Sequence, residues 1–205
     1  MSEFLAFVEL GFRHIVDVAA LDHTLFLLVL AAIYRPRDWR DVLWVVSAFT
    51  VGHSITLALA VADALPVSQA VVEFLIPVTI VATAAENVLV RDRGAAPRAR
   101  RYRPLFAGVF GLVHGAGFAG YLKSLFVSGV ATPLLGFNVG IELGQVVALA
   151  AIAAALAVAD ALLRAVLGAI PRAPRSLPAM RLRTIGVSLA IGTVALGWAV
   201  ERRPW

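Results

Sequence analysis

Three histidines stand in segments that are otherwise too apolar to solvate them. His23, His53 and His114 fall near the middle of the apolar runs around "LDHTLFLLVL", "TVGHSIT" and "FGLVHGAGFAG". An imidazole in hydrocarbon is costly unless it pairs with another group inside the protein. Three imidazoles at a common depth therefore predict one shared polar site, and Asp22, beside His23, adds a carboxylate to it.

A further apolar segment, "LLGFNVGIELGQ", carries a stripe of polar side chains. Asn138, Glu142 and Gln145 are spaced i, i+4 and i+7, which places them on one face of a helix. We predict that His114 faces a small polar cavity shared with the carboxylate of Glu142. Asn138 and Gln145 are expected to orient the groups at that cavity.

These residue types favour a metal ion. The chain has no cysteine, so a bound metal must take nitrogen or oxygen ligands. Neutral imidazoles with a few carboxylates suit a borderline divalent ion such as Ni²⁺, Co²⁺ or Zn²⁺. The predicted ligands are Asp22, His23, His53, His114 and Glu142.

Weaker polar features suggest a path across the bilayer. Glu73 and Glu86 lie toward opposite ends of one apolar run, so a line from Glu73 through the histidines to Glu86 is a candidate route. Ser54 and Asn87 are assigned to the surroundings of this route. His14 is also a candidate there, although we expect it at the wet outer surface and not among the ligands.

Glycines indicate where helices pack closely. Gly136, Gly140 and Gly144 repeat every four residues on the face opposite the polar stripe, and small residues at this spacing let a neighbouring backbone approach. Gly108, Gly111 and Gly115 predict a second close contact beside His114. The glycines at positions 117 and 120 are expected to make the same helix easy to unwind, as in the broken helices of transport sites.

The elements that must position these residues are membrane helices. Of the 205 residues, 60% are hydrophobic and 15% are charged, and the mean hydropathy is +0.88, which is typical of a polytopic membrane protein. Runs of about 20 apolar residues predict an all-α bundle of six transmembrane helices in a single domain, residues 1–205. The predicted spans are 16–33, 42–62, 70–90, 105–127, 134–163 and 184–200, and residues 1–12 are predicted to form a short amphipathic helix at the outer interface.

Arginine placement predicts the orientation. Three connections, within 34–41, 91–104 and 164–183, hold most of the arginines, and the positive-inside rule places them in the cytoplasm. Both termini are then extracytoplasmic, in a multi-pass protein of a bacterial-type inner membrane, although Arg202 and Arg203 fall on the disfavoured side. Because the arginines lie in connections where they set the topology, we expect no nucleic-acid partner. The expected partners are the lipid bilayer and a divalent metal ion. Glycines of the last span could serve a homo-oligomer contact or packing within the chain.

Four motifs, in this order, resemble the membrane domain of the HupE/UreJ family. They are "GFRHIVDVAALDHTLFLL", "FTVGHSITL", "FGLVHGAGFAG" and "FNVGIELGQ". The resemblance implies a small membrane protein regarded as a nickel permease or metal-uptake accessory. It also matches the family's motif positions to Asp22, His23, His53, Ser54, His114, Asn138, Glu142 and Gln145. His14 departs from the family pattern, because it precedes Asp22 by eight residues and not six.

Three functions are open at this point, and we favour the first. It is a permease for a divalent transition-metal ion, nickel or cobalt, with a mid-membrane histidine and carboxylate site. The second is an intramembrane zinc hydrolase with Glu142 or Glu86 as general base, which the lack of an HExxH motif disfavours. The third is a non-transporting accessory or structural subunit whose polar groups only lock helices together.

Overall fold

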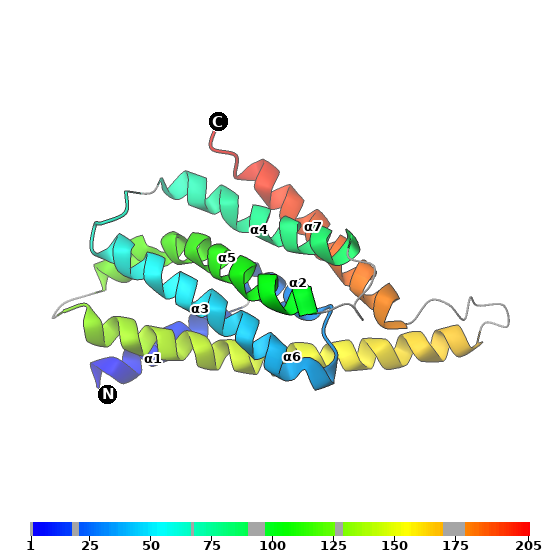
Figure 1. Cartoon of the computed structure of the whole chain (residues 1–205). Helices are drawn as coiled ribbons and strands as arrows, with labels where there is room; N and C mark the ends of the chain where they lie inside the picture. The colour runs from blue at the N-terminus through cyan, green and yellow to red at the C-terminus, as the bar shows by residue number, and fades with distance from the viewer. Residues whose placement is uncertain (1, 18–20, 67, 90–96, 126–128, 170–178) are drawn as a thin grey trace.

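The computed structural model describes residues 2–17, 21–66, 68–89, 97–125, 129–169 and 179–205. Within these ranges all regular structure is helical, as predicted (Figure 1). The α-helices are α1 (Glu3–Val16), α2 (Leu21–Ala31), α3 (Trp39–Val61), α4 (Gln69–Leu89), α5 (Pro97–Ser124), α6 (Ala131–Ala169) and α7 (Ala179–Glu201), and a short 3₁₀ turn covers Pro36–Asp38.

Five helices, α3 to α7, are long and apolar enough to cross a membrane. A sixth crossing exists only if α1 and α2 together form one span, which is bent by 65°. We predicted an unbroken span over residues 16–33, and the structure differs because α1 ends at Val16 and α2, with 11 residues, is too short to cross alone. Residues 18–20, between them, lie outside the described part. Several apolar helices suit a multi-pass membrane protein.

The glycine ladder of α6 receives α1. A Cβ atom on Gly140 would overlap the carbonyl oxygen of Val8, and one on Gly136 would come within 2.6 Å of the carbonyl oxygen of Phe4. The prediction of a close backbone contact here is confirmed. It also places α1 along the first part of α6 (Figure 1), whereas we expected residues 1–12 to lie separately at the interface.

A second glycine contact joins α3 to α5. A Cβ on Gly111 would overlap the carbonyl oxygen of Phe49, and a Cβ on Gly115 would overlap that of His53. The predicted packing role of these glycines is confirmed. α5 is helical without interruption to Ser124, and the expected ease of unwinding near residues 117 and 120 stays a prediction. Among the described helices, a break occurs between α1 and α2 instead.

Both chain ends lie at one end of the bundle (Figure 1). Phe4 contacts Gly136 near the start of α6, and the ring of Trp205 lies 5.3 Å from that of Phe74 near the start of α4. We call this the entry end and the opposite one the arginine end. The arginine-rich stretches 90–96 and 170–178 lie outside the described residues, and the side of the membrane that each end faces stays a prediction.

Candidate metal centre

Three imidazoles from three helices form a cluster. His14 of α1, His23 of α2 and His53 of α3 each offer a ring nitrogen, and these nitrogens lie within 4.8 Å of one another. The ring centroids of His14 and His23 are 4.5 Å apart, and those of His23 and His53 are 6.2 Å apart. These three ring nitrogens of described residues are close enough together to hold one metal ion.

The break between α1 and α2 brings His14 to His23. In a continuous helix, nine residues span about 13.5 Å along the axis and place the two side chains on opposite faces. The bend removes that separation. Across it, the Thr24 hydroxyl donates to the carbonyl oxygen of Ile15 (3.5 Å), one of the acceptors that the end of α1 leaves free.

His14 therefore lies elsewhere than we expected. Its Nε2 atom is buried, and its ring packs against those of His23 and Phe118, with centroids 4.5 Å and 4.1 Å away. We had assigned His14 to the outer surface because the predicted span began at residue 16. The structure folds α1 onto α6 and so carries His14 into the bundle.

His114 of α5 stands next to this cluster. Its ring centroid is 5.3 Å from that of His23, and its Nε2 lies 3.1 Å from the hydroxyl oxygen of Thr79. The Thr79 hydroxyl donates its one proton to the carbonyl of Ile76 (2.7 Å), so it can accept the Nε2–H of His114. That tautomer leaves Nδ1 of His114 unprotonated and able to bind a metal.

Most of these ring nitrogens are buried without a partner. Both nitrogens of His53, Nε2 of His14 and of His23, and Nδ1 of His114 have no hydrogen bond to any part of the chain that the structure describes. His53 and His114 are 0% and 1% exposed, so bulk water does not solvate them. Buried polar atoms are rarely left unpaired, and each such atom needs an explanation.

A cavity of about 390 Å³ leads to these histidines from the entry end. Exposed Gln69 and Glu73, at the start of α4, lie at its mouth, and buried His23 and His114 line it deeper. Asp22 and Arg202 also line it, and Arg202 Nη1 lies 3.2 Å from Asp22 Oδ2. The cavity thus connects two carboxylates with the imidazoles.

The polar stripe of α6 faces α3 and not the histidine cluster. Glu142 accepts a hydrogen bond from the hydroxyl of Ser47 (2.7 Å), and Gln145 accepts one from Thr50 (2.8 Å). Ser54 donates to the backbone carbonyl of Thr50, and Asn138 keeps a buried, unpaired Oδ1. The stripe therefore ties α6 to the helix that carries His53. Glu142 is outside the group of close ligand atoms formed by His14, His23 and His53, and its place at a cavity shared with His114 stays a prediction.

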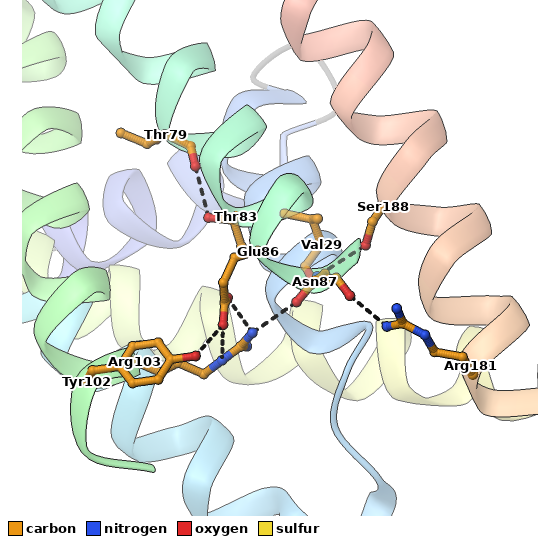
Figure 2. Close-up of polar contacts among 9 residues, drawn as sticks. All are labelled: Val29, Thr79, Thr83, Glu86, Asn87, Tyr102, Arg103, Arg181 and Ser188. Carbon is orange, nitrogen blue, oxygen red and sulfur yellow. Dashed lines mark hydrogen bonds and ion pairs between the residues drawn. The ribbon is translucent and has the colours of Figure 1, made fainter. Parts of the chain in front are cut away.

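At the arginine end, Glu86 is held in an ion pair. Arg103 of α5 reaches both carboxylate oxygens of Glu86, and the Tyr102 hydroxyl donates to the same group (2.6 Å), as Figure 2 shows. Arg103 also donates to Asn87 Oδ1 (3.0 Å). Asn87 in turn donates to the carbonyl of Val29 on α2 (2.6 Å). Glu86 and Asn87 therefore link α2, α4 and α5.

The last helix, α7, adds further polar contacts at the arginine end. Asn87 also donates to the Ser188 hydroxyl (3.2 Å), and Arg181 donates to the backbone carbonyl of Asn87 (Figure 2). Arg181 donates to the backbone carbonyl of Val88 as well. Arg183, 5% exposed, pairs with Asp160 of α6 at 2.6 Å. The arginine end is thus tied together by polar contacts among five helices.

A second, smaller cavity of about 110 Å³ lies at this end, lined by Thr83, Glu86 and Arg103 among others. Phe26 separates it from the histidines: it lines this cavity, and its ring centroid lies 5.4 Å from that of His114. Phe49 packs on both rings, 4.9 Å from Phe26 and 5.1 Å from His114. The route predicted from Glu73 to Glu86 is therefore interrupted by aromatic rings between two cavities.

Sequence reasoning missed the arginines that enter the bundle. We assigned Arg103 and Arg183 to loops, yet they are 6% and 5% exposed and paired with Glu86 and Asp160. One signal was available, because an acidic residue in a membrane span requires a partner.

The comparisons with known proteins give one match. The family model described as HupE / UreJ protein matches residues 1–202, essentially the whole chain. Neither the curated proteins nor the solved structures give a match.

Proposed function

The chain belongs to the HupE/UreJ family, and we propose from this membership and the histidine cluster that it carries a divalent transition-metal ion across a membrane. The family points to nickel or cobalt uptake. The observation that carries the proposal is the set of buried imidazole nitrogens without partners beside a cavity that reaches the entry end.

The donor set suits such an ion. Metal–nitrogen bonds of about 2.0–2.1 Å place tetrahedral ligand nitrogens roughly 3.3 Å apart. The nitrogens of His14, His23 and His53 lie within 4.8 Å, so side-chain rotations can draw them onto one ion. Neutral imidazoles need to lose no proton to bind. Because Arg202 already pairs with Asp22, the Glu73 carboxylate gives the cavity the negative charge that attracts cations toward them.

Transport requires that the site open to the arginine end after it has received the ion from the entry end. The histidines communicate with the entry end, while Phe26, Phe49 and the Glu86–Arg103 pair close the arginine end. We infer that the described conformation receives the ion, and that release requires the pair to part and the aromatic rings to move. The small cavity beyond Phe26 supports a path across the chain over a one-sided hydrolase cleft. Unpaired imidazoles also argue against a purely structural role, in which they would bond to neighbouring helices.

The test is His53→Ala, measured by nickel and cobalt titration of the purified protein in detergent and by radiolabelled uptake into proteoliposomes. We expect metal affinity to fall at least about 100-fold and uptake to cease, because a buried ligand is lost. Thr193→Ala is the control, since that exposed hydroxyl bonds only to its own helix. Normal uptake by the His53 variant would refute the proposal.

A further inference from the structure

Arg202 places a permanent positive charge inside the cavity that leads to the histidines. It lies directly after α7, lines the cavity with His23 and His114, and contacts Asp22 through Nη1 and Oδ2 at 3.2 Å. Its guanidinium carbon also lies 5.2 Å from the centre of the Trp198 ring. The topology rule disfavours an arginine at this end of the chain, and the Asp22 contact gives it a local use.

The backbone that carries Arg202 is fixed by neighbouring contacts. The Arg202 backbone N–H donates to the carbonyl of Trp198 (2.9 Å), and Trp205 packs on Phe74 of α4. The aromatic face of Trp198 is itself a favourable site for a guanidinium. Arg202 can therefore leave Asp22 without leaving the cavity wall.

The Asp22 carboxylate cannot pair fully with Arg202 and bind a metal ion at the same time. The side chains of Asp22 and Arg202 are 24% and 33% exposed, so the pair stands between solvent and the buried imidazoles. A guanidinium keeps its charge at every accessible pH. An arriving cation must therefore displace Arg202 from Asp22, because Arg202 does not lose its proton.

We propose that Arg202 is a tethered competitor of the metal ion for Asp22, and that it sets the affinity and selectivity of the site. This inference rests on the proposed function. Before a metal ion binds, Arg202 neutralises Asp22. A divalent ion that binds the imidazoles strongly can displace the guanidinium, whereas a monovalent ion gains too little to do so. The competition also weakens binding, which favours release of a transported ion.

Arg203 supplies a matched control for the charge. It carries the same side chain one residue later, but its Nε donates to the carbonyl of Val200 (3.0 Å), and its side chain is not part of the cavity lining. Arg202→Gln and Arg203→Gln therefore remove the same charge from the same region, and only the first frees Asp22.

The experiment titrates nickel and cobalt into the purified full chain and its variants, with thermal unfolding to confirm that each is folded. Arg202→Gln should bind roughly three- to tenfold more tightly than the wild type, and Arg203→Gln should stay within about twofold. Arg202→Met, which keeps the length of the apolar stem, should repeat the gain and replaces Arg202→Gln if that variant does not fold. The double variant Asp22→Asn with Arg202→Gln should show no gain over Asp22→Asn alone, because the competition acts through Asp22.

The possible results separate this inference from the proposed function. If the wild type binds nickel and His53→Ala does not, but the variants at 202 and 203 bind alike, only the competition is refuted. An equal gain in the presence and absence of Asp22 would refute it too, since a general field would then explain the effect. If neither the wild type nor Arg202→Gln binds nickel or cobalt, the proposed function fails and this inference with it.

Discussion

The variant Gly115→Ala tests whether backbone contact between α3 and α5 positions the histidines. A Cβ at Gly115 would overlap the carbonyl oxygen of His53 and stand 2.9 Å from its carbonyl carbon and 3.0 Å from its Cα. These are backbone atoms, so no side-chain rotation relieves the overlap. The two helices must separate at the level of His53 and His114.

The size of the effect follows from these distances. The added Cβ lies far inside the ordinary carbon–oxygen contact distance of about 3.3–3.6 Å from the His53 carbonyl oxygen, so the helices must move apart by roughly 1 Å or more. Overpacking of this kind costs typically 1–3 kcal/mol, and we expect a value near 3 kcal/mol because the obstacle is backbone. Metal–ligand distances in a bound site keep within about 0.2 Å of their ideal values, so side-chain rotation must compensate for the shift of His53 relative to the other histidines. Nickel affinity should therefore fall at least about tenfold.

The matched control is Gly120→Ala in the same helix, where an added Cβ meets no atom within 4 Å. Alanine there should be neutral or stabilise the chain by about 0.4–1 kcal/mol, because it restricts the unfolded state. Both variants are compared by unfolding in mixed detergent and by nickel titration. If Gly115→Ala loses no more stability than Gly120→Ala and titrates like the wild type, the close contact does not position the site.

Two further predictions concern partners of the buried groups. Thr79→Val removes the acceptor of the His114 Nε2–H, so nickel affinity in titration should fall about 10–100-fold, with a loss of unfolding free energy of only about 1 kcal/mol. A variant with wild-type affinity would show that the hydroxyl does not set the tautomer. Arg183→Gln leaves Asp160 without its ion-pair partner and should lower the unfolding free energy by about 3–5 kcal/mol, of which adding Asp160→Asn should restore a part. If the double variant is no more stable than the single one, the unpaired carboxylate is not the cause.

The sequence predicts the helices and their close contacts because both depend on local patterns. Apolar runs of 20 residues identify the spans of α3 to α7, and glycines spaced by three or four identify two contacts of backbone with backbone. His23 and His53 of the cluster, and His114 next to it, were also recognisable, because each lies near the middle of an apolar run.

The break after α1 could not be predicted in the same way. The stretch from Val16 to Leu21 contains neither glycine nor proline, so nothing in it marks an end, and the length of the apolar run suggests an unbroken span. Ion pairs such as Asp22 with Arg202 join residues 180 positions apart. No local pattern reports which distant arginine an acidic residue will meet.

Two buried amide side chains that join helices, those of Gln145 and Asn87, have hydrogen-bond partners on neighbouring helices. Gln145 receives a hydrogen bond from Thr50, and Asn87 has partners on α2, α5 and α7. The imidazole of His53, one turn from Thr50 and fully buried, has none among the described residues. Hydroxyls and amides were thus available on the same helices, and phenyl rings line the histidines instead. Since each unpaired buried nitrogen costs about 1–3 kcal/mol, this arrangement is understandable if the missing partner is an ion that enters and leaves.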